Sequence, residues 1–106
     1  MFKLSFFVPE SHLESVKQAV FAAGAGKIGN YDSCCWQTPG TGQFRALDGS
    51  TPFLGELGRV EQVEEFKVEL VCEAALIEQV IIALKSAHPY EEPAYDVIRL
   101  ENFGAG

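Results

Sequence analysis

The chain has 106 residues, a net charge of −7 and a hydrophobic content of 47%. These values suit one domain with a modest core, and they exclude disordered and membrane-spanning proteins. The acidic balance argues against nucleic acid or anionic lipid as partners, because both are bound mainly by basic surfaces. The chain opens without the apolar leader of a secreted protein, and its three cysteines form no CxxC pair. We therefore expect a cytoplasmic protein with reduced thiols.

The first part of the chain predicts a strand followed by a helix. Apolar residues alternate through residues 2–8, which is typical of a half-buried strand. Ser11 and Glu14 then have the spacing of a capping box, and apolar residues follow at helical intervals. Gly24 stands where a helix commonly ends in a left-handed residue. We therefore expect a helix over residues 11–24.

The same pattern recurs in the second half of the chain. The dipeptide Phe-Lys at 2–3 recurs at 66–67, and the dipeptide Tyr-Asp at 31–32 recurs at 95–96, with helix residues in step between them. The remaining predicted elements are strands over residues 30–37, 64–73 and 94–101 and a helix over residues 74–87. Two β-α-β halves in series predict an α+β, ferredoxin-like plait, in which an antiparallel sheet carries two helices on one face. We assign residues 1–106 to a single domain of this kind.

Residues 38–63 form an insertion, rich in glycine and apolar residues, between the second and third predicted strands. A core already covered by two helices cannot bury all of these apolar side chains, so we expect a self-complementary interface between copies of the chain. We assign Trp36, Phe44, Phe53 and Leu54 to this interface. Trp36 suits the core equally well. The alternative for the insertion is that it folds back as an extra hairpin beside its own sheet.

The nine residues HPYEEPAYD, at 88–96, combine a histidine, carboxylates and tyrosines. Pro89 ends the second helix at His88, because a residue before proline avoids the helical region. Pro89 also suits a β-turn that brings His88 and Glu91 within about 7 Å at their Cα atoms. An imidazole beside a carboxylate is half a site for a divalent cation, which needs further ligands from elsewhere. The alternative is that His88 caps the helix and pairs with a carboxylate.

The sequence suggests no complete catalytic grouping. The GTG at 40–42 lacks the GK[ST] and the following helix of a phosphate-binding loop. Cys34 and Cys35 are neighbours in a predicted strand, so they face opposite sides of the sheet and cannot share a metal. His12, the other histidine, lies inside the capping box, where we expect it to be exposed.

Four motifs in order, IGNYDSCCW, GTGQFRALDGSTPFLG, GRVEQVEE and AHPYEEPAYDVIRLE, cover most of the chain. They resemble the YqfO-type domain of the Nif-three-like proteins. The HPYE at residues 88–91 is also similar to that of CutA, a ferredoxin-like trimer associated with divalent-cation tolerance. More distantly, the plan is similar to that of the PII signalling proteins. The resemblance implies a CutA-like plait, β-α-β-(inserted hairpin)-β-α-β.

In longer Nif-three-like proteins this domain is inserted into a larger domain, which carries the ligands of a dinuclear metal site. None of that flanking sequence is present here. The resemblance therefore implies a stand-alone CutA-like domain that forms a trimer and has no established activity.

We interpret the chain as a non-enzymatic, trimeric binding or regulatory module that requires no cofactor. Its ligand, a divalent cation or a small molecule, is expected in clefts between subunits. The residues assigned to the ligand are His88, Tyr90, Glu91, Gly40 and Gly42, with His88 and Glu91 as the metal ligands. Two alternatives stay open: a metal-assisted hydrolase with Glu91 or Glu92 as general base, and a protein-assembly platform without a ligand.

Overall fold

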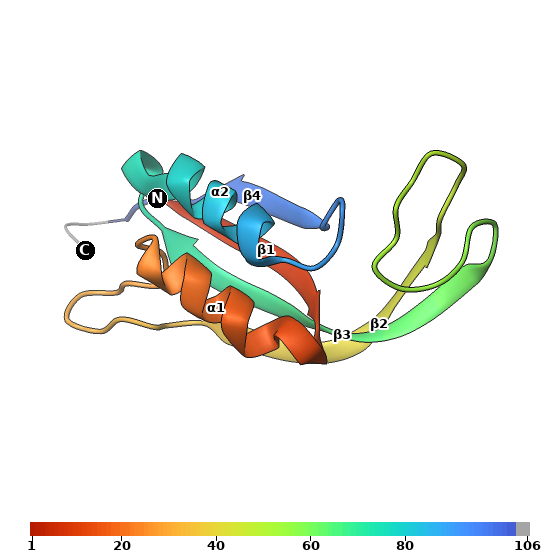
Figure 1. Cartoon of the computed structure of the whole chain (residues 1–106). Helices are drawn as coiled ribbons and strands as arrows, with labels where there is room; N and C mark the ends of the chain where they lie inside the picture. The colour runs from red at the N-terminus through yellow and green to blue at the C-terminus, as the bar shows by residue number, and fades with distance from the viewer. Residues whose placement is uncertain (104–106) are drawn as a thin grey trace.

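A computed structural model describes residues 1–103, in which a four-stranded antiparallel sheet carries two helices on one face (Figure 1). The elements are β1 (Phe2–Pro9), α1 (Leu13–Ala22), β2 (Trp36–Arg45), β3 (Val60–Cys72), α2 (Ile77–Ala87) and β4 (Tyr95–Arg99). The strand order is β2-β3-β1-β4. The predicted ferredoxin-like α+β plait is therefore confirmed. Within residues 1–103, no helix has the length and apolar character needed to cross a bilayer.

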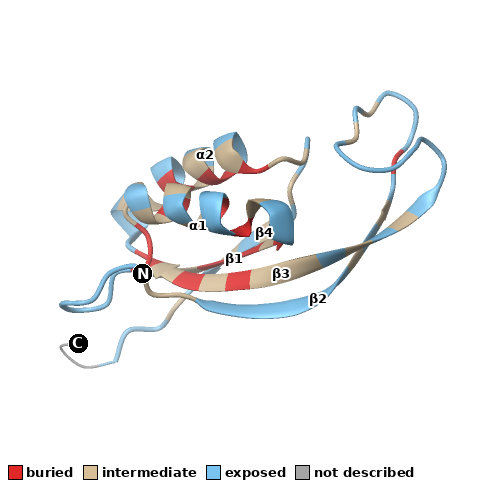
Figure 2. Ribbon diagram, turned by 60° about the horizontal axis from the view of Figure 1, so that its bottom comes forward, coloured by how far each residue is buried: buried red, intermediate tan, exposed pale blue. Residues whose placement is uncertain are grey.

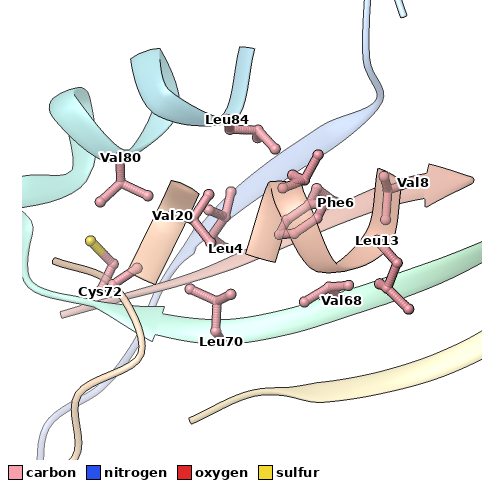
Figure 3. Packing of buried hydrophobic residues seen from close by; sticks show 12 residues of the cluster. Leu4, Phe6, Val8, Leu13, Val20, Val68, Leu70, Cys72, Val80 and Leu84 are labelled. Atoms are coloured by element: carbon pink, nitrogen blue, oxygen red, sulfur yellow. The ribbon is translucent and has the colours of Figure 1, made fainter. Parts of the chain in front are cut away.

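The core lies between the two helices and the two central strands. Alternate residues of β1 and β3 face the helices, as the sequence of residues 2–8 predicts, and they pack against one face of each helix (Figure 3). The most deeply buried side chains are Leu4, Phe6, Val8, Val16, Val20, Val68, Val80 and Leu84. Figure 2 shows that burial concentrates in this layer, whereas the outer part of the β2–β3 hairpin is largely exposed. The core thus accounts for only one part of an elongated molecule.

The capping box predicted at the start of α1 does not form. Residues 10–12 make a short 3-10 turn instead, the helix begins at Leu13, and no side chain caps it. The hydroxyl of Ser11 lies 2.8 Å from Nδ1 of His12, so the histidine takes the hydrogen-bonding group that the capping box needs. Gly24 follows the helix with a φ of +115°, the left-handed region predicted for it.

The second strand begins at Trp36, so the prediction of a strand over residues 30–37 is largely wrong. Residues 24–35 form a glycine-rich loop whose course is fixed by Gly26, at a φ of +78°. The amide of Gly26 donates to the carbonyl of Val71 at 2.8 Å. The internal repeat therefore holds for a strand and a helix in each half but not for the next strand. Cys34 and Cys35 consequently lie in this loop and not in a strand.

Strands β2 and β3 form a hairpin that is longer than the rest of the sheet. Their pairing runs from Trp36 opposite Glu69 to Arg45 opposite Val60, whereas β1 pairs with β3 only as far as Glu65. Beyond that point the hairpin continues alone and curves away from the sheet (Figure 1). The predicted insertion over 38–63 thus consists of paired strand residues at 38–45 and 60–63 and of residues 46–59, which form the loop at the hairpin tip. It is continuous with β2 and β3, so no extra hairpin forms beside the sheet, but its tip folds back onto its own chain through Thr51 and Phe53.

His88 fixes the connection between α2 and β4 to the end of β1. The residue before Pro89 is extended, with a ψ of 138°, and its side chain is 6% exposed. The amide of Tyr90 donates to Nδ1 of His88 at 3.1 Å, so Nδ1 is an acceptor and the ring proton is on Nε2. This Nε2 donates to the carbonyl of Phe7 at 2.7 Å. Both ring nitrogens are therefore used by backbone groups.

The Phe7 carbonyl needs this donor because β4 ends too early to supply one. The ladder between β1 and β4 closes at Phe6 opposite Tyr95, and the amide of Phe7 donates to the carbonyl of Ala94 at 3.2 Å. The imidazole of His88 thus supplies the donor that a further residue of β4 would have supplied to the Phe7 carbonyl. Burial lowers the pKa of His88 below its ordinary value of 6.5, which keeps the ring in the neutral, Nε2-protonated form that these two bonds require.

Replacing His88 by alanine should lower the free energy of unfolding by about 2–3 kcal/mol, because a partly buried carbonyl and an amide both lose their partner. His88→Gln keeps an amide donor for the Phe7 carbonyl and should cost about 1 kcal/mol. Urea unfolding of the wild type and the two variants measures both values. Equal losses in the two variants would contradict the role of the Phe7 hydrogen bond.

Stability should also depend on pH through His88. Its pKa is lower in the folded chain than in the unfolded chain, so the unfolded chain takes up the proton first as the pH falls through 6.5. The stabilisation present at pH 7.5 should therefore decrease towards pH 5.5. Chemical unfolding across this range should show a steeper decrease for the wild type than for His88→Gln. Identical pH profiles would show that the two states bind the proton equally.

Candidate ligand-binding cleft

A cleft of about 850 Å³ lies along the outer part of the β2–β3 hairpin. Three segments that are distant in sequence form its walls: the hairpin strands, residues 46–54 at the hairpin tip, and residues 90–94 between α2 and β4. The length of the hairpin creates this space, because its strands continue past β1 and curve towards the α2–β4 connection (Figure 1). Clefts of this size are typical of small-molecule sites.

Three aromatic rings cluster in the cleft, one from each wall. Tyr90 lies between the other two, with its ring centroid 6.3 Å from that of Phe44 and 6.2 Å from that of Phe53. The ring of His88 lies 4.8 Å from that of Tyr90 and supports it from the core side. Phe53 also contacts His12 edge to face, at a centroid distance of 5.4 Å. These contacts hold the hairpin tip against the body of the chain.

The hydroxyl of Tyr90, in the α2–β4 connection, donates to Oε2 of Glu65 on β3 at 2.7 Å. Burial and this carboxylate raise the pKa of Tyr90, so the phenol keeps its proton and remains a donor. The Glu65 carboxylate lies over Gly42 of β2, where an added Cβ would overlap its Oε1 atom. A Cβ at Gly40 would meet nothing within 4 Å. Gly42 is therefore the position that leaves room for Glu65.

Glu91 connects the α2–β4 connection to the hairpin tip. Its Oε1 accepts a hydrogen bond from the amide of Thr51 at 3.0 Å. This contact joins two segments that are far apart in sequence, and Glu91 lines the cleft together with the aromatic cluster. The tip loop is thus held over the cleft by one hydrogen bond and by the ring contacts of Phe53.

The predicted ligand residues separate into two groups. Tyr90, Glu91, Gly40 and Gly42 line the cleft together. His88 does not line it, because its ring is buried beneath Tyr90 and bonded to two backbone groups. The carboxylate of Glu91 meets Thr51 instead of converging with His88 on a cation. Residues 1–103 contain no group of three or more His, Cys, Asp or Glu side chains that could hold a metal.

The predicted interface residues also separate. Phe44 and Phe53 contact Tyr90 of their own chain, so part of their apolar surface is covered without a partner. Trp36, at the start of β2, is 71% exposed, and Leu54 is 38% exposed. The placement of Trp36 in the core, which the sequence left open, is therefore wrong.

Two contributors were not predicted from the sequence: Glu65, which lines the cleft, and Thr51, whose amide binds Glu91. Both act through side-chain or backbone contacts with residues far away in the chain, which spacing along the sequence does not reveal. One signal was available for Glu65. A glycine inside a strand often marks close approach of another group, and Gly42 lies in β2 near Glu65 on the paired strand.

Comparison with known proteins gives close relatives for most of the chain, although no family model matches it. The chain is 49% identical over 98 residues to a GTP cyclohydrolase 1 type 2 homolog of Mycobacterium tuberculosis, a match that covers 92% of this chain and 26% of the relative. A protein of the same name from Bacillus subtilis is 43% identical over 99 residues, again with 26% of its length covered. The chain therefore spans about a quarter of the length of these relatives.

Solved structures agree with these similarities. A Bacillus cereus protein related to NIF3 superposes with a TM-score of 0.82 at 44% identity, covering 95% of this chain and 26% of that protein. CutA from Archaeoglobus fulgidus has a TM-score of 0.69 at 17% identity, covering 99% of this chain and 89% of CutA, which shows a shared fold. The resemblance to Nif-three-like proteins is thus confirmed. The chain is a homologue of a segment of the NIF3-related GTP cyclohydrolase 1 type 2 homologs, and it has the CutA-like fold.

Proposed function

We propose that this chain is a non-enzymatic binding module whose ligand enters the cleft between the β2–β3 hairpin and the α2–β4 connection. The observation that carries the proposal is the construction of this cleft. Each of its walls contributes an aromatic ring, and hydrogen bonds at Glu65 and Glu91 hold the walls in place. A preformed apolar pocket with a few fixed polar groups is the usual form of a small-molecule site.

The polar groups of the cleft favour binding over catalysis. Tyr90 keeps its proton because its pKa is raised, and its hydroxyl is already used by Glu65. Glu91, the candidate general base, accepts a backbone hydrogen bond from Thr51. The relatives are named as cyclohydrolase homologs, but this chain spans about a quarter of their length, so a binding role within such a protein also fits the name.

We also propose that the module works as a homo-oligomer, with the trimer as the predicted state. The support comes from apolar side chains that the chain leaves exposed on the hairpin and at the start of β2. The exposed side chains are Trp36, Leu47, Leu57 and Val60, each at least half exposed. Apolar surface of this kind on one arm of an elongated chain is typical of an interface between copies.

The ligand proposal predicts a difference between two neighbouring glycines. Gly42→Ala should displace the Glu65 carboxylate and with it the Tyr90 hydroxyl, whereas Gly40→Ala should leave both in place because its Cβ meets nothing. In a fragment screen followed by NMR, small aromatic compounds should shift the Tyr90 and Phe44 signals of wild type and Gly40→Ala. Their affinity for Gly42→Ala should be about tenfold weaker, the equivalent of one lost hydrogen bond to a charged group.

A screen in which no compound perturbs the cleft residues of the wild type would argue against a ligand site. Equal binding by both glycine variants would show that the position of Glu65 does not matter to the cleft.

The oligomer proposal predicts a mass change on adding charge to the hairpin. Leu57, 50% exposed at the tip, does not line the cleft, so Leu57→Glu should weaken association by at least about tenfold without changing the ligand site. Gln18→Glu on the exposed side of α1 adds the same charge and should have no effect. Sedimentation equilibrium measures the mass of all three proteins. A monomeric wild type at micromolar concentration would contradict the proposal.

A further inference from the structure

We infer that the cleft takes an organic cation, a molecule with an apolar or aromatic body and an ammonium group. The inference rests on the proposed function of the cleft as a ligand site. It adds the chemical class of the ligand, which the fold and the relatives do not give.

The charged residues of the cleft are mostly carboxylates. Its walls include Glu65, Glu69, Glu91 and Glu92 but only one cationic side chain, that of Lys67. Glu69 is paired with Lys3 at 2.9 Å and lies 3.7 Å from Lys67, so the two lysines offset this carboxylate and leave one positive charge. The other three carboxylates form no ion pair with any of the residues 1–103. The cleft therefore carries an excess of negative charge.

The two carboxylates with hydrogen bonds inside the cleft have only neutral partners. Tyr90 is a neutral donor and bonds to only one oxygen of Glu65, and the donor to Glu91 is the neutral amide of Thr51. Neither bond supplies a counter-charge. A ligand with an ammonium group would supply one without displacing the groups that hold the cleft together.

The aromatic cluster favours the same class of ligand. The faces of Phe44, Phe53 and Tyr90 attract cations, and this attraction is strongest where water is excluded. A phosphate-bearing ligand would instead be repelled by Glu65 and Glu91. A bare metal ion would find too few ligands, because residues 1–103 offer no group of three. Carboxylates beside aromatic rings fit an organic ammonium ion better than either.

Three aromatic probes of similar size test the inference: benzylamine, benzyl alcohol and benzoate, with charges of plus one, zero and minus one at neutral pH. Each is titrated into the wild-type protein while the ring signals of Tyr90, Phe44 and Phe53 are followed by NMR. Benzylamine should bind about tenfold more tightly than benzyl alcohol, as a cation on aromatic faces does, and benzoate should bind most weakly. Raising the salt concentration should weaken only the binding of benzylamine.

Glu65→Gln and Glu64→Gln form a matched pair for the same titration. Both remove one negative charge, but Glu65 lines the cleft and Glu64 does not. The amide oxygen introduced by Glu65→Gln can still accept the hydrogen bond of the Tyr90 hydroxyl, so a change in binding reports the lost charge and not a lost hydrogen bond. The affinity for benzylamine should fall about tenfold in Glu65→Gln and stay unchanged in Glu64→Gln.

The outcomes separate this inference from the function on which it rests. Binding of benzyl alcohol or benzoate at the same rings, as tightly as benzylamine, would overturn the cation inference and leave the cleft as a ligand site. An equal loss of benzylamine binding in both glutamate variants would also overturn it, because the charge would then act from outside the cleft. The absence of binding by all three probes would overturn the inference and the proposed function together.

Discussion

The hydrogen bond from Nε2 of His88 to the Phe7 carbonyl is the contact on which the cleft depends. It holds the connection between α2 and β4 against the end of β1, where no strand is left to pair with that carbonyl. The same imidazole also positions the residues that follow His88. Nδ1 of the same ring accepts the amide of Tyr90, and the Tyr90 side chain reaches across to Glu65 on β3. One buried neutral imidazole thus positions the residue at the centre of the aromatic cluster.

The long hairpin supplies the other half of the site. It leaves the sheet where β1 stops, and without further contacts it would be a two-stranded arm with little core of its own. The bond between Glu91 and the Thr51 amide and the ring contacts of Phe53 hold its tip over the α2–β4 connection. Other apolar side chains of the arm, such as Leu57, lie outside the cleft and remain exposed. The proposed ligand site and the proposed interface therefore use different residues of the same arm.

The sequence predicted the parts of the fold that depend on local pattern. Alternation placed β1, helical spacing placed both helices, and Pro89 ended α2 at His88. The sequence-based prediction failed where a contact outside the local pattern changed where a helix or strand begins. His12 takes the Ser11 hydroxyl away from the cap, and the loop held by Gly26 delays the second strand to Trp36.

The prediction of the candidate site also agrees with the structure for some residues and not for others. Four of the five residues predicted to hold a ligand, Tyr90, Glu91, Gly40 and Gly42, line the cleft; they attracted notice as unusual residues at a turn and in a strand. The assignment of His88 to a cation site rested on its residue type. The structure gives its two ring nitrogens to backbone groups of β1 and of its own loop, partners that only the register of the sheet brings within reach.

The protonation of this ring tests most directly whether His88 holds the cleft together. It can be measured by long-range ¹H–¹⁵N NMR at neutral pH with and without zinc. We expect a proton on Nε2, a bare Nδ1, and no change in either nitrogen when zinc is added, because both already have backbone partners. A proton on Nδ1, or a shift of either ring nitrogen with zinc, would contradict the claim that His88 holds the cleft together and would make it a ligand.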